Sequence, residues 1–394
     1  MSKVRLIRIT TVPISLKLLL KGQHDFMKNK GFDVLGVSSS GKELDEVKHD
    51  EQIPVHTLEM TRMISPLQDL KSLWAFYWLC KKVKPTIVHS HTPKAGIVSM
   101  LGARLAGVPI RLHTVAGMPL MEAAGIKRVI LDWVEKLTYG AATGVYPNSK
   151  GLYDFIVQHQ YTNNEKLKVI GNGSSNGIDT SFFSREELKE VDLNKLRMSL
   201  NINENDFVFI FVGRLVSDKG INELVEAFKV LGNTSKVDRN IKLLLVGPLE
   251  TALDPLLDVT LKDIQANPNI ISVGFQKDVR PYFAISDALV FPSYREGFPN
   301  VVMQAGAMGL PAIVSDINGC NEIIVEGQNG TIIPVKNSVA IQKTMERLLI
   351  DKGFYFSLKQ NARKMICERY EQQVVWDALL TEYKQLLKDK GLDN

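Results

Sequence analysis

Residues 207–220 are Phe-Val-Phe-Ile-Phe-Val-Gly-Arg-Leu-Val-Ser-Asp-Lys-Gly, an apolar run that ends in a glycine and a loop with two cations. Six apolar residues in a row, without polar alternation, predict a parallel strand that is covered on both faces. Gly213 turns the chain out of this strand, and a helical pattern follows at Ile221–Leu231. The stretch therefore predicts the first strand, loop and helix of a doubly wound α/β domain, with Arg214 and Lys219 on the loop.

Short apolar runs alternate with amphipathic stretches along the whole chain, and the alternation runs twice. This predicts two doubly wound, Rossmann-like domains at residues 1–173 and 174–373. Gly171–Asp179, which is rich in Gly, Asn and Ser, has the character of a linker and of a hinge. The predicted strands are Arg5–Thr10, Asp33–Val37, Thr86–His89, Arg111–Val115, Gly144–Pro147 and Leu167–Ile170, then Phe207–Val212, Lys242–Val246, Ile270–Val273, Ala288–Phe291, Ala312–Ser315 and Gly330–Ile333.

The composition is that of a soluble globular protein of two ordinary domains, with 394 residues of which 45% are hydrophobic and 23% charged. No uncharged apolar run approaches the roughly 18 residues that span a bilayer. The N-terminus predicts a charged strand and not a signal peptide. The three cysteines are far apart and lack metal-ligand spacing, which predicts reduced thiols in the cytoplasm.

The charge is unevenly distributed. Residues 1–170 carry 23 Lys and Arg against 14 Asp and Glu, a net +9, whereas residues 171–394 carry a net −4. Two interpretations stay open: an ordinary solvated surface, or an N-terminal half that meets an anionic membrane surface or lipid phosphate. Nucleic acid is not expected as a partner, because the basic residues are scattered and no binding motif accompanies them.

A second strand and turn carry polar groups about eighty residues after the first. Asp287–Ser293 is followed by Glu296, and a helix is predicted from Val301. The N–H groups at a helix start favour an anion. Glu296 can accept hydrogen bonds from sugar hydroxyls, and Gln304 is expected on the first turn, facing the same opening. Together with Arg214 and Lys219, which can neutralise a diphosphate without metal, these groups suit a nucleotide sugar. The alternative is a plain Arg214–Glu296 ion pair with a solvated glutamine.

Other motifs are absent or incomplete. The chain has neither Asp-x-Asp nor His-Glu-x-x-His, so no metal site and no cofactor are predicted. Gly36–Lys42 matches most of a phosphate-binding loop, but Glu43 replaces the Ser or Thr that would hold magnesium, and a surface turn is expected instead. His89 and His91 alternate at a strand end, where we expect hydrogen-bonded side chains near the surface.

The chain resembles the retaining GT-B glycosyltransferases of family 4, which carry two glutamates eight positions apart. The resemblance covers nearly the whole length. Within the family, the chain is similar to bacterial enzymes that build capsule, O-antigen or lipid-linked oligosaccharide. The stretches that carry the resemblance are Gly213–Gly220, Val246-Gly247, Gly274-Phe275, Ser293–Phe298, Gly309–Pro311 and Gly319–Glu322, and for the narrower match His89–Gly96 and His113–Gly117.

This resemblance implies two Rossmann-like domains facing a central cleft, an N-terminal acceptor domain whose packing is completed by the helix at 374–394, and a C-terminal donor domain. Arg214 and Lys219 match the pair that binds the donor pyrophosphate, and Glu296 matches the first glutamate, beside the donor sugar. His113 matches the N-domain histidine at the reacting centre; a strand-end histidine satisfied by backbone is its alternative. Gln304 stands where the second glutamate holds the ribose. Donor contacts are also implied for Gly247, Gly297, Phe298, Pro299, Asn300 and Val301.

The implied activity is transfer of a hexosyl or N-acetylhexosaminyl group from a nucleotide diphosphate sugar, UDP-linked, to a polyprenyl-diphosphate-linked saccharide, with retention. The enzyme would be peripheral on the inner face of the cytoplasmic membrane. Lysine-flanked apolar stretches at 16–21 and 73–84 suit interfacial helices, or core helices with basic ends. A UDP-sugar 2-epimerase on the same fold and a non-catalytic sugar-nucleotide-binding protein are the alternative functions.

Overall fold

The computed structural model describes residues 3–61, 63, 65–118, 120, 123–234, 239–252 and 254–393. The chain forms two compact units. Unit 1 comprises Met1–Gly177 and Gln373–Asn394, and unit 2 comprises Ile178–Gln372. The first division lies four residues beyond the predicted boundary at 173/174, and the C-terminal segment belongs to unit 1. The chain therefore passes between the units at two points, and unit 1 is built from both ends of the sequence.

Unit 1 is built on a parallel sheet that has six strands among the described residues, in the order β3-β2-β1-β4-β5-β6. This is the order of a doubly wound domain, in which the chain builds outward from β1 and then returns to build outward on its other side. The strands are β1 Arg5–Ile9, β2 Asp33–Ser38, β3 Val55–Thr57, β4 Ile87–Ser90, β5 Ile110–Val115 and β6 Gly144–Pro147.

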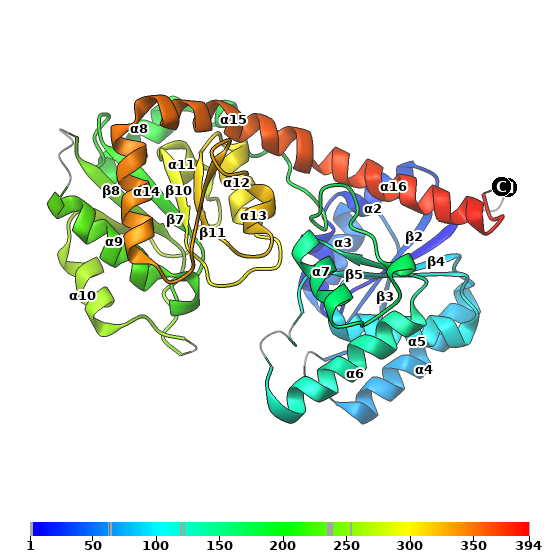
Figure 1. Ribbon diagram of the computed structural model, residues 1–394. Helices are drawn as coiled ribbons and strands as arrows, with labels where there is room; N and C mark the ends of the chain where they lie inside the picture. The colour runs from blue at the N-terminus through cyan, green and yellow to red at the C-terminus, as the bar shows by residue number, and fades with distance from the viewer. Residues whose placement is uncertain are drawn as a thin grey trace. The chain divides into compact units, whose positions relative to one another are not determined.

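Helices cover both faces of this sheet (Figure 1). The C-terminal helix α16, red in Figure 1, completes one layer: Leu379, Tyr383 and Leu387 are buried in the same core cluster as Leu6 of β1. The helices of unit 1 are α1 Pro13–Leu19, α2 Gln23–Asn29, α3 Lys42–Asp50, α4 Pro66–Val83, α5 Pro93–Ala106, α6 Gly125–Ala141 and α7 Lys150–Gln158, a 3₁₀ turn η2 at Asn164–Lys166, and α16 Gln372–Asp389.

The sequence-based strands of unit 1 agree with the structure at five places and differ at two. Leu167–Ile170 is not a strand: only Leu167 makes a bridge, to Val145 of β6, so this prediction is wrong. Its apolar side chains fill a core rather than extend the sheet. The sixth strand is β3, a short edge strand that is partly to fully exposed and therefore lacks an apolar pattern.

Unit 2 repeats the topology of unit 1. Among its described residues the parallel sheet has the order β12-β11-β10-β7-β8-β9. The opening stretch of the sequence forms β7, whose first five residues are buried, as the unbroken apolar run predicts. All six predicted strands are present: β7 Phe207–Val212, β8 Ile241–Val246, β9 Ile270–Ser272, β10 Ala288–Phe291, β11 Ala312–Ser315 and β12 Gly330–Ile333.

The helices of unit 2 again lie on both faces of their sheet (Figure 1). The predicted helix at 221–231 is α9, and the one at 301–308 is α12. Of the helices described in the chain, none is long and apolar enough to cross a membrane. The elements are η3 Arg185–Glu187, α8 Glu190–Ser199, η4 Ser217–Lys219, α9 Ile221–Thr234, α10 Asp258–Ala266, α11 Arg280–Ala284, α12 Asn300–Ala307, α13 Cys320–Ile323, α14 Ser338–Ile350 and α15 Lys352–Tyr370.

Candidate functional site

The predicted motifs of unit 2 lie where its sheet changes direction. Strands β7 and β10 are neighbours, but the chain builds to one side from β7 and to the other from β10. In doubly wound domains, ligands bind outside the carboxyl ends of the strands at this switch point. Arg214 and Lys219 follow β7, and Glu296 follows β10. The topology therefore brings together two segments that are about eighty residues apart in the sequence.

Lys219 and Glu296 form an ion pair at this switch point. Lys219 Nζ lies 2.7 Å from Glu296 Oε1, and their side chains are only 15% and 19% exposed. Ser293 Oγ lies 3.0 Å from the same carboxylate oxygen and 3.5 Å from Lys219 Nζ. The carboxylate, the ammonium group and the hydroxyl therefore form one compact polar cluster of low exposure, in which charge interactions are stronger than at an open surface.

Arg214 pairs with Glu250 and not with Glu296, the partner named in the alternative interpretation. Its Nη1 lies 2.7 Å from Oε2 of Glu250, and the Arg214 side chain is half exposed. The alternative of a plain Arg214–Glu296 ion pair is therefore wrong, because Glu296 is held by Lys219. The hydrogen bond from Arg214 to Glu250 raises the pKa of the guanidinium further. A second cation thus lies on the same loop as Lys219, and its bond to Glu250 uses only one of its N–H donors.

Two glycines allow the loops of the site to approach closely. At Gly220 the backbone has φ +70°, and a Cβ would lie 2.2 Å from the carbonyl oxygen of Pro292. At Gly247, after β8, φ is +147° and a Cβ would lie 1.8 Å from the carbonyl oxygen of Gly213. Both positions combine a conformation that favours glycine with a backbone contact. They fix Lys219 and Arg214 against the neighbouring strand ends.

Helix α12 opens directly beside the cluster. Pro299 is its N-cap, and no side chain among the described residues caps its first turn. Its free N–H groups and dipole make this end favourable for an anion. The loop before it is held by Asn318, whose Nδ2 donates to the carbonyl oxygen of Gly297 at 2.6 Å. The predicted donor loop therefore runs from this anchored glycine into the first turn of α12, and its residues are Gly297, Phe298, Pro299, Asn300 and Val301.

Gln304 lies one residue further along α12 than expected. The helix begins at Asn300, so Gln304 is its fifth residue and starts the second turn rather than belonging to the first. The residue is partly exposed. Its side chain makes no hydrogen bond to the described residues, whereas its carbonyl accepts from Met308 in the helix. The amide is thus available beside the site, on the same helix as the N–H groups.

The predicted histidine of unit 1 is enclosed. His113 lies on β5, is 2% exposed, and its Nδ1 lies 2.7 Å from Ser90 Oγ on the adjacent β4. A Cβ at Gly96 would lie 2.5 Å from the His113 ring, so α5 packs directly against the imidazole. Burial lowers the pKa of His113 to about 4. The imidazole is therefore neutral at pH 7. The alternative prediction, a histidine satisfied by the backbone, has the wrong partner, because the side chain of Ser90 holds the imidazole.

His89 and His91 are buried, which contradicts the expectation that they lie near the surface. His89 bridges Tyr383 of α16 and Thr114 of β5, at 2.6 and 2.7 Å. His91 Nε2 lies 3.2 Å from Nη2 of the fully buried Arg8. Burial, and then the charge of Arg8 and neighbouring histidines, holds the pKa of both imidazoles well below the usual range. The sequence could not show this, because it is α16, from the far end of the chain, that covers them.

Acid should destabilise unit 1 because of these histidines. Besides the three named above, His24 is fully buried with a pKa well below its usual range. The unfolded chain binds protons below about pH 6.5 and the folded unit does not, so stability falls as the pH drops from 6.5 toward 4. His113 alone is expected to contribute a loss of about 3 kcal/mol across this window. Urea unfolding of unit 1 at pH 7.5, 5.5 and 4.5 measures the slope.

The variant His113→Asn should reduce the pH dependence of the unfolding free energy by the contribution of one titrating group. His49→Gln replaces an exposed histidine of α3 and is the control. An unchanged slope in His113→Asn would contradict a neutral, buried imidazole at this position.

Several residues of the site were not predicted. Ser293 and Glu250 bind Glu296 and Arg214, and Asp218 forms an ion pair with Arg295 at 3.1 Å. A usable indication existed, because each of the three follows a strand at the same edge of the sheet: Asp218 after β7, Glu250 after β8 and Ser293 after β10. No group of three His, Cys, Asp or Glu among the described residues is placed to hold a metal ion. The three cysteines are free thiols.

Comparison with known proteins defines the class. A model of a glycosyl transferase 4-like domain matches residues 27–173, and a model of glycosyl transferases group 1 matches residues 192–365. The chain is 34% identical over 391 residues to the capsular polysaccharide biosynthesis glycosyltransferase CapM of Staphylococcus aureus, covering 99% of both chains. The chain therefore belongs to this family of two-domain glycosyltransferases.

Other relatives and structures agree with this class. The chain is 27% identical, over 93% of both chains, to an Escherichia coli UDP-Gal:α-D-GlcNAc-diphosphoundecaprenol α-1,3-galactosyltransferase. A glycosyltransferase structure from Rickettsia africae matches with a TM-score of 0.80 and 19% identity, covering 98% of this chain and all of that one. The Anabaena HepE structure with UDP matches with a TM-score of 0.77 at 19% identity, over 98% of this chain and all of HepE. The fold is thus the predicted α/β GT-B fold.

Proposed function

We propose that this glycosyltransferase moves a hexosyl or N-acetylhexosaminyl group from a UDP-linked sugar to a hydroxyl of a polyprenyl-diphosphate-linked saccharide, with retention, in surface polysaccharide synthesis. The Staphylococcus aureus relative is named for capsule biosynthesis. The Escherichia coli relative and a Campylobacter jejuni relative at 23% identity over 83% of the chain are named for diphosphoundecaprenol-linked acceptors. Unit 1 would bind the acceptor and unit 2 the donor.

The observation that carries this proposal is the Lys219–Ser293–Glu296 cluster at the switch point of unit 2. Lys219 has three donors, and the contacts to Glu296 and Ser293 fix its ammonium group without using all of them. As the bond to the sugar breaks, negative charge grows on the leaving diphosphate. A fixed, shielded cation stabilises the additional charge on the leaving diphosphate more than it stabilises the diphosphate of the intact substrate, which lowers the barrier.

Glu296, Arg214 and the start of α12 complete the proposed donor site. Glu296 is oriented by Lys219 and Ser293, which both bind Oε1, and its second oxygen would accept hydrogen bonds from sugar hydroxyls. Arg214 and the N–H groups of α12 would hold the diphosphate from two sides. With these cations and donors the proposal requires no metal ion or other cofactor. His113, neutral at pH 7, would contribute a hydrogen bond rather than a charge near the reacting centre.

Turnover of a panel of UDP- and GDP-sugars, with and without a polyprenyl-diphosphate-linked saccharide, tests this function. We expect nucleotide release that depends on the acceptor and yields an elongated lipid. Release of UDP and free sugar without acceptor would instead indicate a 2-epimerase. Binding of a nucleotide sugar without any turnover would indicate a non-catalytic protein.

Gln304→Glu tests the proposed ribose contact. A hydrogen bond to a charged group contributes about 1 kcal/mol more than one to a neutral group, so UDP should bind about fivefold more tightly. Calorimetric titration of UDP into both proteins gives the two dissociation constants. Gln265→Glu, on the exposed face of α10, controls for the added charge alone. Equal affinities for UDP in all three proteins would remove Gln304 from the site.

A lipid-linked acceptor implies that the enzyme works at the inner face of the cytoplasmic membrane. We propose peripheral attachment through unit 1. The stretch at 16–21 belongs largely to the core, since Leu16 and Leu20 are buried. The stretch at 73–84 lies in α4, where Trp74 and Trp78 are exposed although Phe76 and Leu79 are buried.

A further inference from the structure

Two helices of unit 1 present large apolar side chains to solvent. On α4, Leu67, Leu70, Trp74 and Trp78 are between 49% and 81% exposed. Their spacing of three and four residues places them along one stripe of the helix. A water-facing stripe of this kind does not stabilise a soluble monomer, and contiguous apolar surface marks a contact with something apolar.

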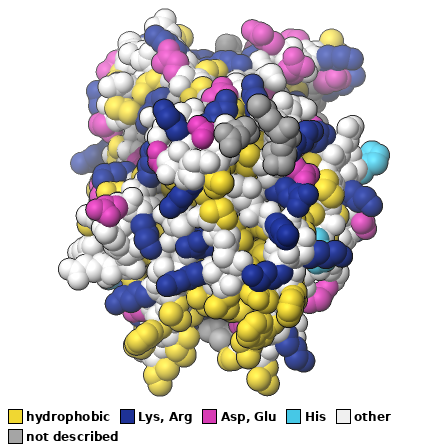
Figure 2. Space-filling model, turned by 90° about the vertical axis from the view of Figure 1, so that its right-hand side faces the viewer, with side chains coloured by type: hydrophobic (Ala, Val, Ile, Leu, Met, Phe, Trp, Pro, Cys, Tyr) yellow, Lys and Arg dark blue, Asp and Glu magenta, His cyan; other side chains and the backbone are white. Residues whose placement is uncertain are grey.

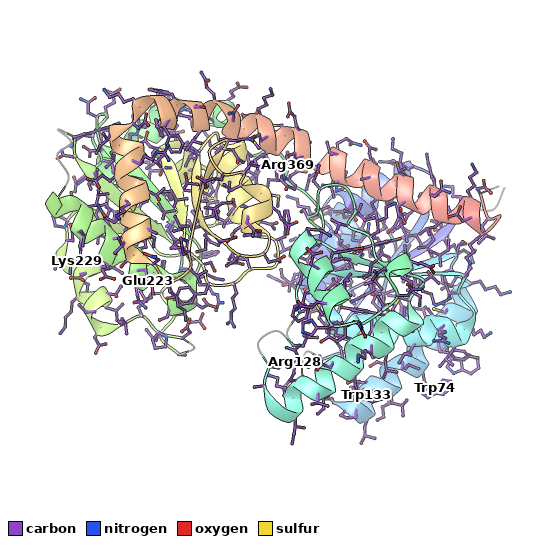
Figure 3. The ribbon with its side chains drawn as sticks, in the orientation of Figure 1. Trp74, Arg128, Trp133, Glu223, Lys229 and Arg369 are labelled. Atoms are coloured by element: carbon purple, nitrogen blue, oxygen red, sulfur yellow. The ribbon has the colours of Figure 1, made fainter. Side chains whose placement is uncertain are left out.

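Helix α6 carries a second stripe. Ile126, Val129, Ile130, Trp133 and Leu137 recur at helical spacing and are between 43% and 81% exposed. Both α4 and α6 pack against α5, so the two stripes belong to one layer of unit 1. Figure 3 shows Trp74 and Trp133 projecting at the same edge, and Figure 2 shows apolar side chains gathered there.

Cations flank the apolar stripes, and the carboxylates of these helices are occupied. Lys71, Lys81 and Lys82 of α4 and Lys127 and Lys136 of α6 are exposed. Figure 2 shows rows of Lys and Arg next to the apolar edge. The acidic residues of the two helices are neutralised or enclosed: Asp69 pairs with Lys94, Asp132 pairs with Arg128, and Glu135 is buried.

We propose that the α4–α6 surface, defined by these two stripes and their lysines, is the membrane-docking surface of the enzyme and prefers anionic lipid. Tryptophan favours the boundary between headgroups and acyl chains, where its ring is apolar and its N–H can reach water. The lysines lie beside the apolar edge, where anionic headgroups would neutralise them. This inference rests on the proposed function, since a lipid-linked acceptor must be reached at a bilayer.

Sedimentation with vesicles tests the surface. The full chain should bind vesicles of phosphatidylcholine and phosphatidylglycerol, and Trp78→Ser/Trp133→Ser should weaken the partition coefficient by at least about tenfold. Val339→Ser/Phe356→Ser removes two side chains of unit 2 with similar exposure, 58% and 57% against 65% for each tryptophan, and should leave binding unchanged. Equal loss in both variants, or no vesicle binding by the parent chain, would overturn the proposal.

The lysines are tested separately. Lys71→Gln/Lys81→Gln/Lys82→Gln should lose about fivefold per lysine on vesicles with phosphatidylglycerol, and nothing on phosphatidylcholine alone. If the parent chain instead dimerises without lipid and the tryptophan variant is monomeric, the surface is an interface between copies and the proposal fails. Vesicle binding without transfer to any lipid-linked acceptor would overturn the proposed function alone. Transfer without vesicle binding would overturn only the docking surface.

Discussion

Replacing Lys219 with alanine is expected to lower kcat by about 10²–10³-fold, the effect seen when one fixed donor to a developing negative charge is removed. The ammonium group is the best-shielded cation of the site, paired with Glu296 at 2.7 Å. Because its stabilisation of the leaving diphosphate is realised in the transition state, kcat should fall more than the affinity for UDP. Steady-state turnover and UDP titration measure the two effects.

Lys229 provides a matched control for this experiment. It forms a lysine–carboxylate pair of the same length, 2.7 Å to Asp263, in the same unit but on α9 (Figure 3). Lys229→Ala should keep full turnover. The unfolding midpoints of both variants separate lost stability from lost catalysis, since removing Lys219 leaves the shielded Glu296 carboxylate without its cation. A Lys219→Ala protein that is folded and fully active would remove Lys219 from the proposed mechanism.

Gly247→Ala is expected to have the largest effect on stability, a loss of more than about 4 kcal/mol in unit 2. A methyl group there would lie 1.8 Å from the carbonyl oxygen of Gly213, so the ends of β7 and β8 must separate. Backbone strain at positive φ adds about 1–2 kcal/mol. Turnover should fall as well, because Gly213 leads directly into Arg214. Urea unfolding and steady-state kinetics of the purified variant measure both.

Gly274→Ala is a control that carries the backbone strain of a positive φ without a close contact of the kind found at Gly247. Gly274 also has positive φ, +66°, but a methyl group there would meet nothing within 4 Å. We expect a loss of only about 1–2 kcal/mol and little change in turnover. If the two variants were equally stable, the tight packing of the strand ends would not be a feature of the protein in solution.

The sequence predicted the architecture well because parallel strands are buried on both faces. An unbroken apolar run such as 207–212 can be recognised as a strand without knowing which strands lie next to it. The rule that an apolar run marks a strand failed at two places: it missed one strand and wrongly predicted another. Val55–Thr57 is too short and exposed to show an apolar run, and Leu167–Ile170 is apolar because it packs in a core outside the sheet.

Pairings within the site were harder to predict than its location. Residue types placed cations and a carboxylate at the switch point, but a difference of a few ångströms decides which cation holds Glu296. Which side chains are exposed could not be predicted from the sequence either. The stripe of α6 looks like an ordinary core-facing stripe in the sequence, and His89 looks like a surface residue. In both cases the deciding factor is whether a distant helix covers the position, which local periodicity does not encode.

The return of α16 to unit 1 affects how the chain matures during synthesis. Leu379, Tyr383 and Leu387 are core residues of unit 1, and Tyr383 hydrogen-bonds His89. The ribosome makes them after unit 2, so residues 1–177 emerge with an apolar face uncovered while all of unit 2 is still being translated. Unit 2, although it is second in the sequence, is thus the first that can close its core. Until α16 has been translated, the core of unit 1 is incomplete, and unit 1 needs chaperone protection or its own partial stability.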